Sequence, residues 1–115
     1  MGITIYHNPG CSTSRQTLAI IREAGVEPDI VEYLKTPPTR YELKRMLAAM
    51  GQTARDVMRR KEALYGELGL DDPALSEDQL IDAMVDNPRL IERPIVVTER
   101  GTRLCRPAER VREIL

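Results

Sequence analysis

The sequence predicts an α/β protein in which strands and helices alternate near both ends of the chain. An apolar run, an amphipathic segment and a second β-prone run follow one another within the first 35 residues. A helical region fills the middle, and two β-prone runs and a helix form the end. The 115 residues suit a single domain with one hydrophobic core. We therefore expect a mixed sheet with helices packed against it.

The beginning of the chain predicts a strand–helix–strand unit. Residues 3–6 form a short apolar strand, and residues 29–33 form a second β-prone run. Between them, residues 12–24 repeat apolar side chains on one helical face, and a glycine follows. The segment from residue 3 to residue 33 has the usual length of a βαβ unit, so the two strands are expected to be parallel.

The middle of the chain predicts helices. Thr39 begins one capping-box pattern, in which a threonine or serine is followed three residues later by glutamate or glutamine, and Ser76 begins another. An amphipathic helix follows each pattern. Two shorter helices are expected over residues 53–58 and 61–68. We interpret residues 38–88, approximately, as a helical insertion.

The end of the chain predicts a hairpin and a final helix. Residues 94–98 and 102–105 are β-prone runs on either side of a turn at 99–101. Pro107 suits the first position of the closing helix. Two parallel strands, an antiparallel hairpin and their helices are the arrangement of a thioredoxin-like fold. We therefore expect residues 1–115 to form a single thioredoxin-like domain.

Composition excludes several classes of partner. The net charge of −1 leaves no basic footprint for nucleic acid as a bulk property. With four Tyr and neither Phe nor Trp, the composition does not favour an aromatic platform for base stacking. No apolar run is long enough to span a bilayer, and no targeting segment is visible. We expect a cytoplasmic protein that binds neither nucleic acid nor membrane. A disulfide between Cys11 and Cys105 is not expected in that compartment.

Cys11 stands where a strand, a turn and a helix meet. A free cysteine is commonly a small buried hydrophobe, but a position after Pro9-Gly10 at a helix start favours a nucleophile. A helix N-terminus lowers a cysteine pKa to somewhere in about 3.5–7.5, and its N–H groups can hold an oxyanion. Ser14 completes a Cys-x-x-Ser pattern, which cannot close its own disulfide, so another thiol must resolve any oxidised Cys11.

Three further residues have two interpretations each. Ser14 either donates a hydrogen bond to the thiolate or solvates the helix N-terminus. His7, the only histidine, either shuttles a proton or has a structural or electrostatic role, and we favour the latter. Cys105 is either a resolving cysteine or a buried strand residue, and the absence of an electropositive setting favours burial.

Three arginines have settings that differ from an ordinary solvated surface. Arg93 and Arg106 each precede a proline at a strand end, and Arg59 ends a short helix beside Arg60. Proline restricts the backbone of the residue before it. In a thioredoxin-like fold the loop before the hairpin lies next to the cysteine, so Pro94 is a candidate cis-proline. Guanidinium groups pair bidentately with tetrahedral oxyanions, which favours phosphate or arsenate over a peptide disulfide.

Residues 7–15, His-Asn-Pro-Gly-Cys-Ser-Thr-Ser-Arg, resemble the active-site loop of glutaredoxin-coupled arsenate reductases. Residues 93–97 and 101–107 resemble two further signature segments of that family, and the likeness runs through the whole chain. The resemblance implies a cytoplasmic oxidoreductase that converts arsenate to arsenite. It implies glutathione as co-substrate, glutaredoxin as partner, no metal and no tightly bound cofactor.

The resemblance also implies a role for each site residue. Cys11 would attack arsenate and form a covalent adduct, which glutathione then attacks before glutaredoxin recycles the mixed disulfide. His7 and Ser14 would help to keep Cys11 as a thiolate. The substrate-binding arginines would be Arg59, Arg93 and Arg106. Arg60 is adjacent to Arg59, and only the direction in which each side chain leaves the helix decides which of the two would bind the substrate.

Two other functions are compatible with the same fold. One is a monothiol glutaredoxin-like disulfide reductase, against which the arginine set argues. The other is a catalytically silent regulator that binds RNA polymerase. Regulators of that superfamily carry Cys-x-x-Cys as a redox switch, so Ser14 argues against this function.

Overall fold

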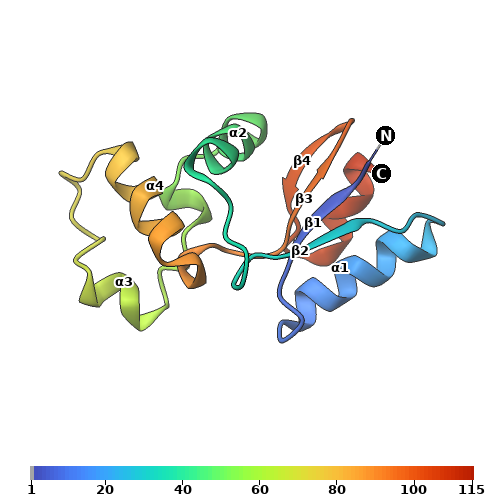
Figure 1. Cartoon of the computed structure of the whole chain (residues 1–115), viewed down its shortest axis with the longest axis horizontal. Helices are drawn as coiled ribbons and strands as arrows, with labels where there is room; N and C mark the ends of the chain where they lie inside the picture. The colour runs from blue at the N-terminus through green and yellow to red at the C-terminus, as the bar shows by residue number, and fades with distance from the viewer. Residues whose placement is uncertain (1) are drawn as a thin grey trace. The chain divides into compact units, whose positions relative to one another are not determined.

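The computed structural model describes residues 2–115 and contains a four-stranded mixed sheet with the strand order β2-β1-β3-β4 (Figure 1). In chain order the elements are β1 (Thr4–His7), α1 (Ser12–Glu23), β2 (Asp29–Glu32), α2 (Arg40–Met50), η1 (Arg55–Val57), α3 (Ala63–Glu67), α4 (Glu77–Asp86), η2 (Pro88–Leu90), β3 (Ile95–Thr98), β4 (Gly101–Leu104) and η3 (Ala108–Ile114). They form two compact units, Met1–Thr36 with Arg93–Leu115, and Pro37–Glu92. The predicted helical insertion lies within the second unit.

The first unit holds the whole sheet. β1 and β2 run parallel, as the strand–helix–strand pattern predicted, and the last pair in their register is His7 with Glu32. β3 is antiparallel to β1 and forms a hairpin with β4. The predicted thioredoxin-like α/β fold is therefore confirmed. The strand β1 lies one residue later than predicted, so its last residue is His7 and the site turn begins directly after it.

The core of the first unit lies between the sheet and two helices. Alternate strand residues such as Ile5 and Val96, which are paired in register, face α1 and η3. Figure 1 shows these two helices against the sheet, and they also contact each other. The buried members of this core are Ile5, Leu18, Ile20, Ile21, Val96, Cys105, Ala108, Val111 and Ile114. Their burial fixes the orientation of α1, and with it the position of the helix N-terminus.

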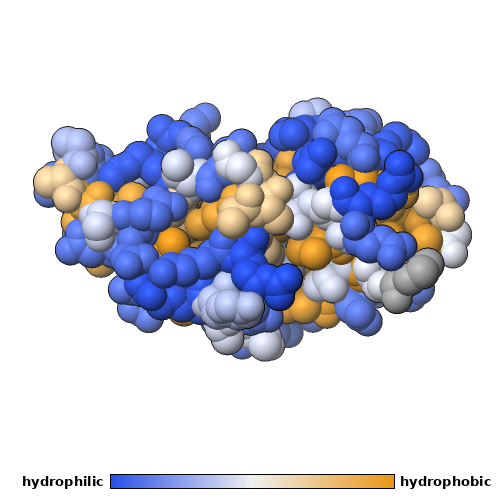
Figure 2. All heavy atoms as spheres, turned by 90° about the horizontal axis from the view of Figure 1, so that it is seen from above, coloured by the Kyte–Doolittle hydropathy of each residue, from blue (hydrophilic) through white to orange (hydrophobic). Residues whose placement is uncertain are grey.

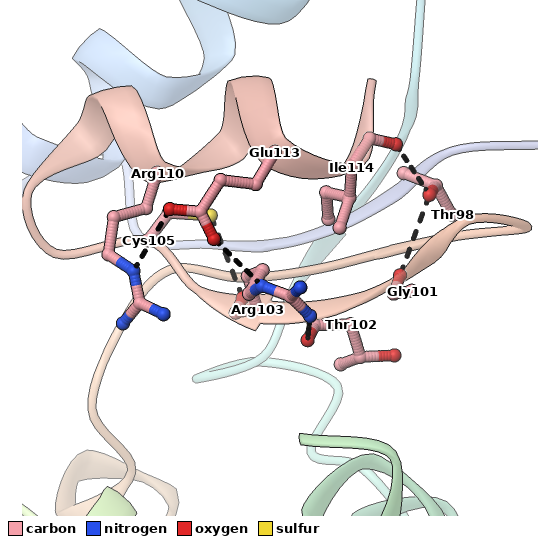
Figure 3. Close-up of polar contacts among 8 residues, drawn as sticks. All are labelled: Thr98, Gly101, Thr102, Arg103, Cys105, Arg110, Glu113 and Ile114. Carbon is pink, nitrogen blue, oxygen red and sulfur yellow. Dashed lines mark hydrogen bonds and ion pairs between the residues drawn. The ribbon is translucent and has the colours of Figure 1, made fainter.

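Polar contacts fasten the hairpin to η3 (Figure 3). The Thr98 hydroxyl donates to the carbonyl of Ile114 at 2.8 Å, and Arg103 Nε donates to Glu113 at 3.1 Å. Pro107 is the N-cap of η3 and not its first residue, because its ψ of 164° is extended. The closing helix is also 3₁₀, which corrects the simple helix start that the sequence suggested.

The second unit is helical, and its two longest helices begin at the predicted capping boxes. Thr39 accepts from the Glu42 N–H, Ser76 accepts from the Gln79 N–H, and both reciprocal bonds are formed. The predicted helix over 53–58 is shortened to a single 3₁₀ turn, since so short a segment gains little from helix propagation. The buried hydrophobic side chains of this unit come from most of its helices and turns: Leu43, Met46, Leu47, Ala54, Val57, Met58, Leu70, Leu80, Ile81, Met84, Leu90 and Ile91.

Hydrophilic residues predominate on the face drawn in Figure 2, with smaller hydrophobic areas between them. This agrees with a chain in which 30% of the residues are charged. Across residues 2–115, none of the helices combines the length and the apolar character needed to cross a bilayer.

Candidate active site

A tight turn carries the chain from the end of β1 to Cys11, the N-cap residue of α1. The Cys11 N–H donates to the Asn8 carbonyl at 3.0 Å, and the Cys11 carbonyl accepts the first helical bond from the Arg15 N–H at 3.0 Å. Cys11 itself is extended, with φ −102° and ψ 123°. No side chain caps α1, so its first N–H groups are available near the sulfur.

Asn8 organises this turn, a role that the sequence analysis did not assign. Its side-chain oxygen accepts from the Gly10 N–H at 2.9 Å, and its own N–H donates to the Ser14 hydroxyl at 3.1 Å. An asparagine before Pro-Gly is the usual signal of such a side-chain-stabilised turn. Asn8 therefore fixes both the loop and the first turn of α1 beneath Cys11.

Arg93 and Arg106 lie on either side of the hairpin and approach the same sulfur. Arg106 Nη1 lies 4.0 Å from Cys11 Sγ and also donates to the Arg93 carbonyl at 3.0 Å. The pairing of Ile95 with Leu104 brings the two arginines together, because each stands just outside the hairpin. The Arg93–Pro94 and Arg106–Pro107 peptide bonds are both cis, as the sequence suggested for Pro94.

The Cys11 side chain is only 8% exposed, and burial alone would raise the pKa of its thiol. The Ser14 backbone N–H and the guanidinium groups of Arg93 and Arg106 favour the thiolate and outweigh burial, so the Cys11 pKa is lowered. The sulfur therefore lies in an electropositive environment that suits a nucleophile, and its role as the nucleophile stays a prediction.

Two N–H donors of the Arg93 guanidinium have no acceptor among residues 2–115. Its Nε and Nη1 atoms are buried and have no hydrogen-bond partner among them. An unpaired buried donor is costly, and a guanidinium fork suits the oxygens of a tetrahedral anion. The first unit thus combines a cysteine of lowered pKa with donors suited to an oxyanion.

His7 and Ser14 form a buried pair below the turn. His7 is 6% exposed, and its Nδ1 lies 2.6 Å from the Ser14 hydroxyl. Burial lowers the pKa of His7; Glu32 opposes this effect, and Arg22 and Arg15 add to it. The imidazole is therefore neutral at pH 7, and its contact with Ser14 holds the turn. Ser14 reaches the sulfur through its backbone N–H, while its hydroxyl contacts His7 and Asn8.

Arg59 belongs to the second unit, where two carboxylates hold it. Its Nη1 lies 3.1 Å from Glu62, and its Nε lies 3.4 Å from Glu92. Arg60 is exposed. Arg59 is thus the more firmly oriented of the two candidates, and its part in anion binding stays a prediction.

Cys105 has an environment opposite to that of Cys11. It is 0% exposed within the core of the first unit, and burial raises its pKa to about 12. Its Sγ contacts the Arg103 carbonyl at 3.6 Å (Figure 3), and its backbone N–H donates to the Pro94 carbonyl. Cys105 is therefore a core residue, the interpretation that the sequence favoured.

The sequence of this chain is similar to those of known proteins. A sequence profile described as the ArsC family matches residues 6–114. The chain belongs to the ArsC family. An arsenate reductase of Rhizobium meliloti is 58% identical over 115 residues, which are 100% of this chain and 82% of that protein.

Two further proteins match this chain over nearly their whole length. The solved structure of an arsenate reductase from Vibrio cholerae has a TM-score of 0.96 and 50% identity, and the match covers 100% of this chain and 98% of that one. The Escherichia coli K12 protein YfgD, described as uncharacterized, is 54% identical over 114 residues, which are 98% of this chain and 96% of YfgD.

The two cysteines are expected to differ sharply in reactivity. Iodoacetate alkylates thiolates, and the lower pKa of Cys11 means that it ionises at lower pH than Cys105. Below neutral pH, we expect mass mapping to find carboxymethyl groups on Cys11 and almost none on Cys105. Preferential labelling of Cys105 in the folded protein would contradict the description of both sites.

Proposed function

We propose that this protein reduces arsenate to arsenite through a covalent adduct on Cys11. The observation that carries the proposal is the sulfur itself, whose pKa is lowered beside the guanidinium groups of Arg93 and Arg106. The names of its relatives support arsenate as the oxyanion. The proposal includes a cytoplasmic location and requires neither a metal nor a tightly bound cofactor.

In the first step, the Cys11 thiolate attacks the arsenic atom and one arsenate oxygen leaves as water after protonation. This forms a sulfur–arsenic(V) bond without a change of oxidation state. The unpaired donors of Arg93, and the Arg106 guanidinium, bind the remaining oxygens and stabilise their charge. Arg59 would be a third oxyanion ligand.

In the second step, a glutathione thiolate attacks the Cys11 sulfur. A sulfur–sulfur bond forms while the sulfur–arsenic bond breaks, and its electron pair stays with arsenic, which leaves as arsenite in the +3 state. Since Ser14 supplies no second thiol in the motif, the mixed disulfide needs an external thiol. Glutaredoxin then takes the glutathione moiety and restores Cys11.

A coupled assay tests this function. NADPH oxidation is followed with glutathione, glutaredoxin and glutathione reductase present, with and without arsenate, and arsenite is measured directly. We expect oxidation that depends on both arsenate and the protein, with one arsenite formed per NADPH. Absence of arsenite would refute the proposal. Reduction of glutathionylated peptides that survives the loss of Arg93 and Arg106 would instead favour a monothiol disulfide reductase.

A further inference from the structure

Arg59 is held by its backbone as well as by its side chain. The Arg59 N–H donates to the Leu90 carbonyl at 2.7 Å. The Glu92 N–H donates to the Val57 carbonyl at 2.8 Å. These two bonds flank an antiparallel bridge between two buried residues of the second unit. The backbone of Arg59 is therefore fixed opposite residues 90–92.

The Arg59 guanidinium lies between two carboxylates. Its Nη1 donates to Glu62 at 3.1 Å, and its Nε lies 3.4 Å from Glu92. The exposed fractions of the three side chains lie between 17% and 29%, so water screens these contacts only in part. A second arginine, Arg89, donates to Glu62 at 2.6 Å. Arg89 therefore helps to hold the carboxylate that orients Arg59.

The two carboxylates have opposite effects on an oxyanion that Arg59 would bind. Their negative charge opposes the anion, and this effect is weak because Arg59 and Arg89 balance the charges of Glu62 and Glu92. Their second effect is to order a long side chain before the anion arrives. Ordering such a side chain only on binding costs affinity, so a guanidinium that is already oriented binds more tightly. We expect the ordering to outweigh the repulsion.

We propose that Glu62 is a positioning residue for arsenate reduction and that it acts through Arg59. The inference rests on the proposed function, in which Arg59 is the third oxyanion ligand. Glu92 holds the same guanidinium but directly precedes Arg93, so a change at Glu92 would affect two oxyanion ligands at once. Glu62 is free of this complication.

Replacing Glu62 with alanine tests the proposal without requiring turnover. Iodoacetamide, a neutral reagent, alkylates Cys11, and bound arsenate should protect the sulfur. We expect Glu62→Ala to raise the arsenate concentration needed for half-protection about threefold to tenfold. In the coupled assay the KM for arsenate should rise by the same factor while kcat changes little. Asp82→Ala is the matched control, because Asp82 pairs with Arg40 at 2.6 Å in the same unit, and it should behave like the wild type.

A double-mutant cycle shows whether Glu62 acts through Arg59. In an Arg59→Ala protein, the further change Glu62→Ala should weaken arsenate binding no more. A further loss as large as in the wild-type background would mean that Glu62 acts elsewhere, and would overturn the proposal. Unchanged or tighter arsenate binding by Glu62→Ala alone would overturn it too.

The ordering of Arg59 can be measured directly by ¹⁵N relaxation of its Nε–H group, without arsenate. We expect restricted motion in the wild type and faster motion in Glu62→Ala. Equal mobility in the two proteins would contradict the positioning role. If arsenate protects Cys11 but no arsenite forms, the proposed reaction fails while the Glu62 assignment is still decided by the protection series. If arsenite forms and Glu62→Ala matches the wild type, only the Glu62 assignment fails.

Discussion

Replacing Cys11 with serine is expected to abolish arsenate reduction, with a loss of about 10³-fold or more in turnover. A serine hydroxyl stays protonated at pH 7, so the same helix N-terminus and arginines have no anionic nucleophile to stabilise. The fold should persist, since serine has the same branching as cysteine and is slightly smaller, and Cys11 is not part of the core between the sheet and its two helices. Arsenite production by Cys11→Ser, measured in the coupled assay, gives the result directly.

Cys105→Ala is the matched control for this experiment. It removes the other thiol of the chain, which lies in the core with a pKa of about 12. We expect this variant to keep its turnover and to lose some thermal stability through the small cavity left behind. Arsenite formation by Cys11→Ser at the wild-type rate, or its loss in a folded Cys105→Ala protein, would reverse the assignment of the nucleophile.

Local sequence patterns predicted several elements of the fold and of the site because each of these elements depends on neighbouring residues. The turn before Cys11, the capping box at Thr39 and the hairpin are all determined by short-range hydrogen bonds or backbone preferences. The positions of Arg93 and Arg106 could also be predicted from the sequence. Each arginine precedes a proline at a strand end, and a thioredoxin-like sheet brings such loops close to the cysteine.

Properties that depend on burial could not be predicted in the same way. The sequence allowed His7 to carry a charge, but its pKa is lowered because the folded sheet and α1 remove it from water. Likewise, the hydrogen-bond partners of the Ser14 hydroxyl depend on where His7 and Asn8 lie in the folded chain, which the sequence does not show. The 3₁₀ form of η3 was likewise not predicted, because the spacing of its apolar residues does not distinguish a 3₁₀ helix from an α-helix.

Arg93→Ala and Arg106→Ala are each expected to lower kcat/KM for arsenate about 10- to 150-fold. Each change removes charge-assisted hydrogen bonds worth about 1.5–3 kcal/mol. Arg93 should have the larger effect, because its buried Nε and Nη1 have no partner among the described residues and Arg106 is more exposed. Arg112→Ala is the control, since Arg112 is an exposed arginine of η3, and it should retain wild-type efficiency.

The same two arginines also lower the Cys11 pKa, so a lost thiolate must be separated from lost oxyanion binding. Without either guanidinium the thiol pKa rises, and alkylation of Cys11 shifts to higher pH. Raising the assay pH then restores the thiolate but not the missing hydrogen bonds. If the variants recover full efficiency at high pH, the arginines act only on the sulfur. A deficit that persists when alkylation shows complete ionisation assigns them to arsenate, the result that we expect.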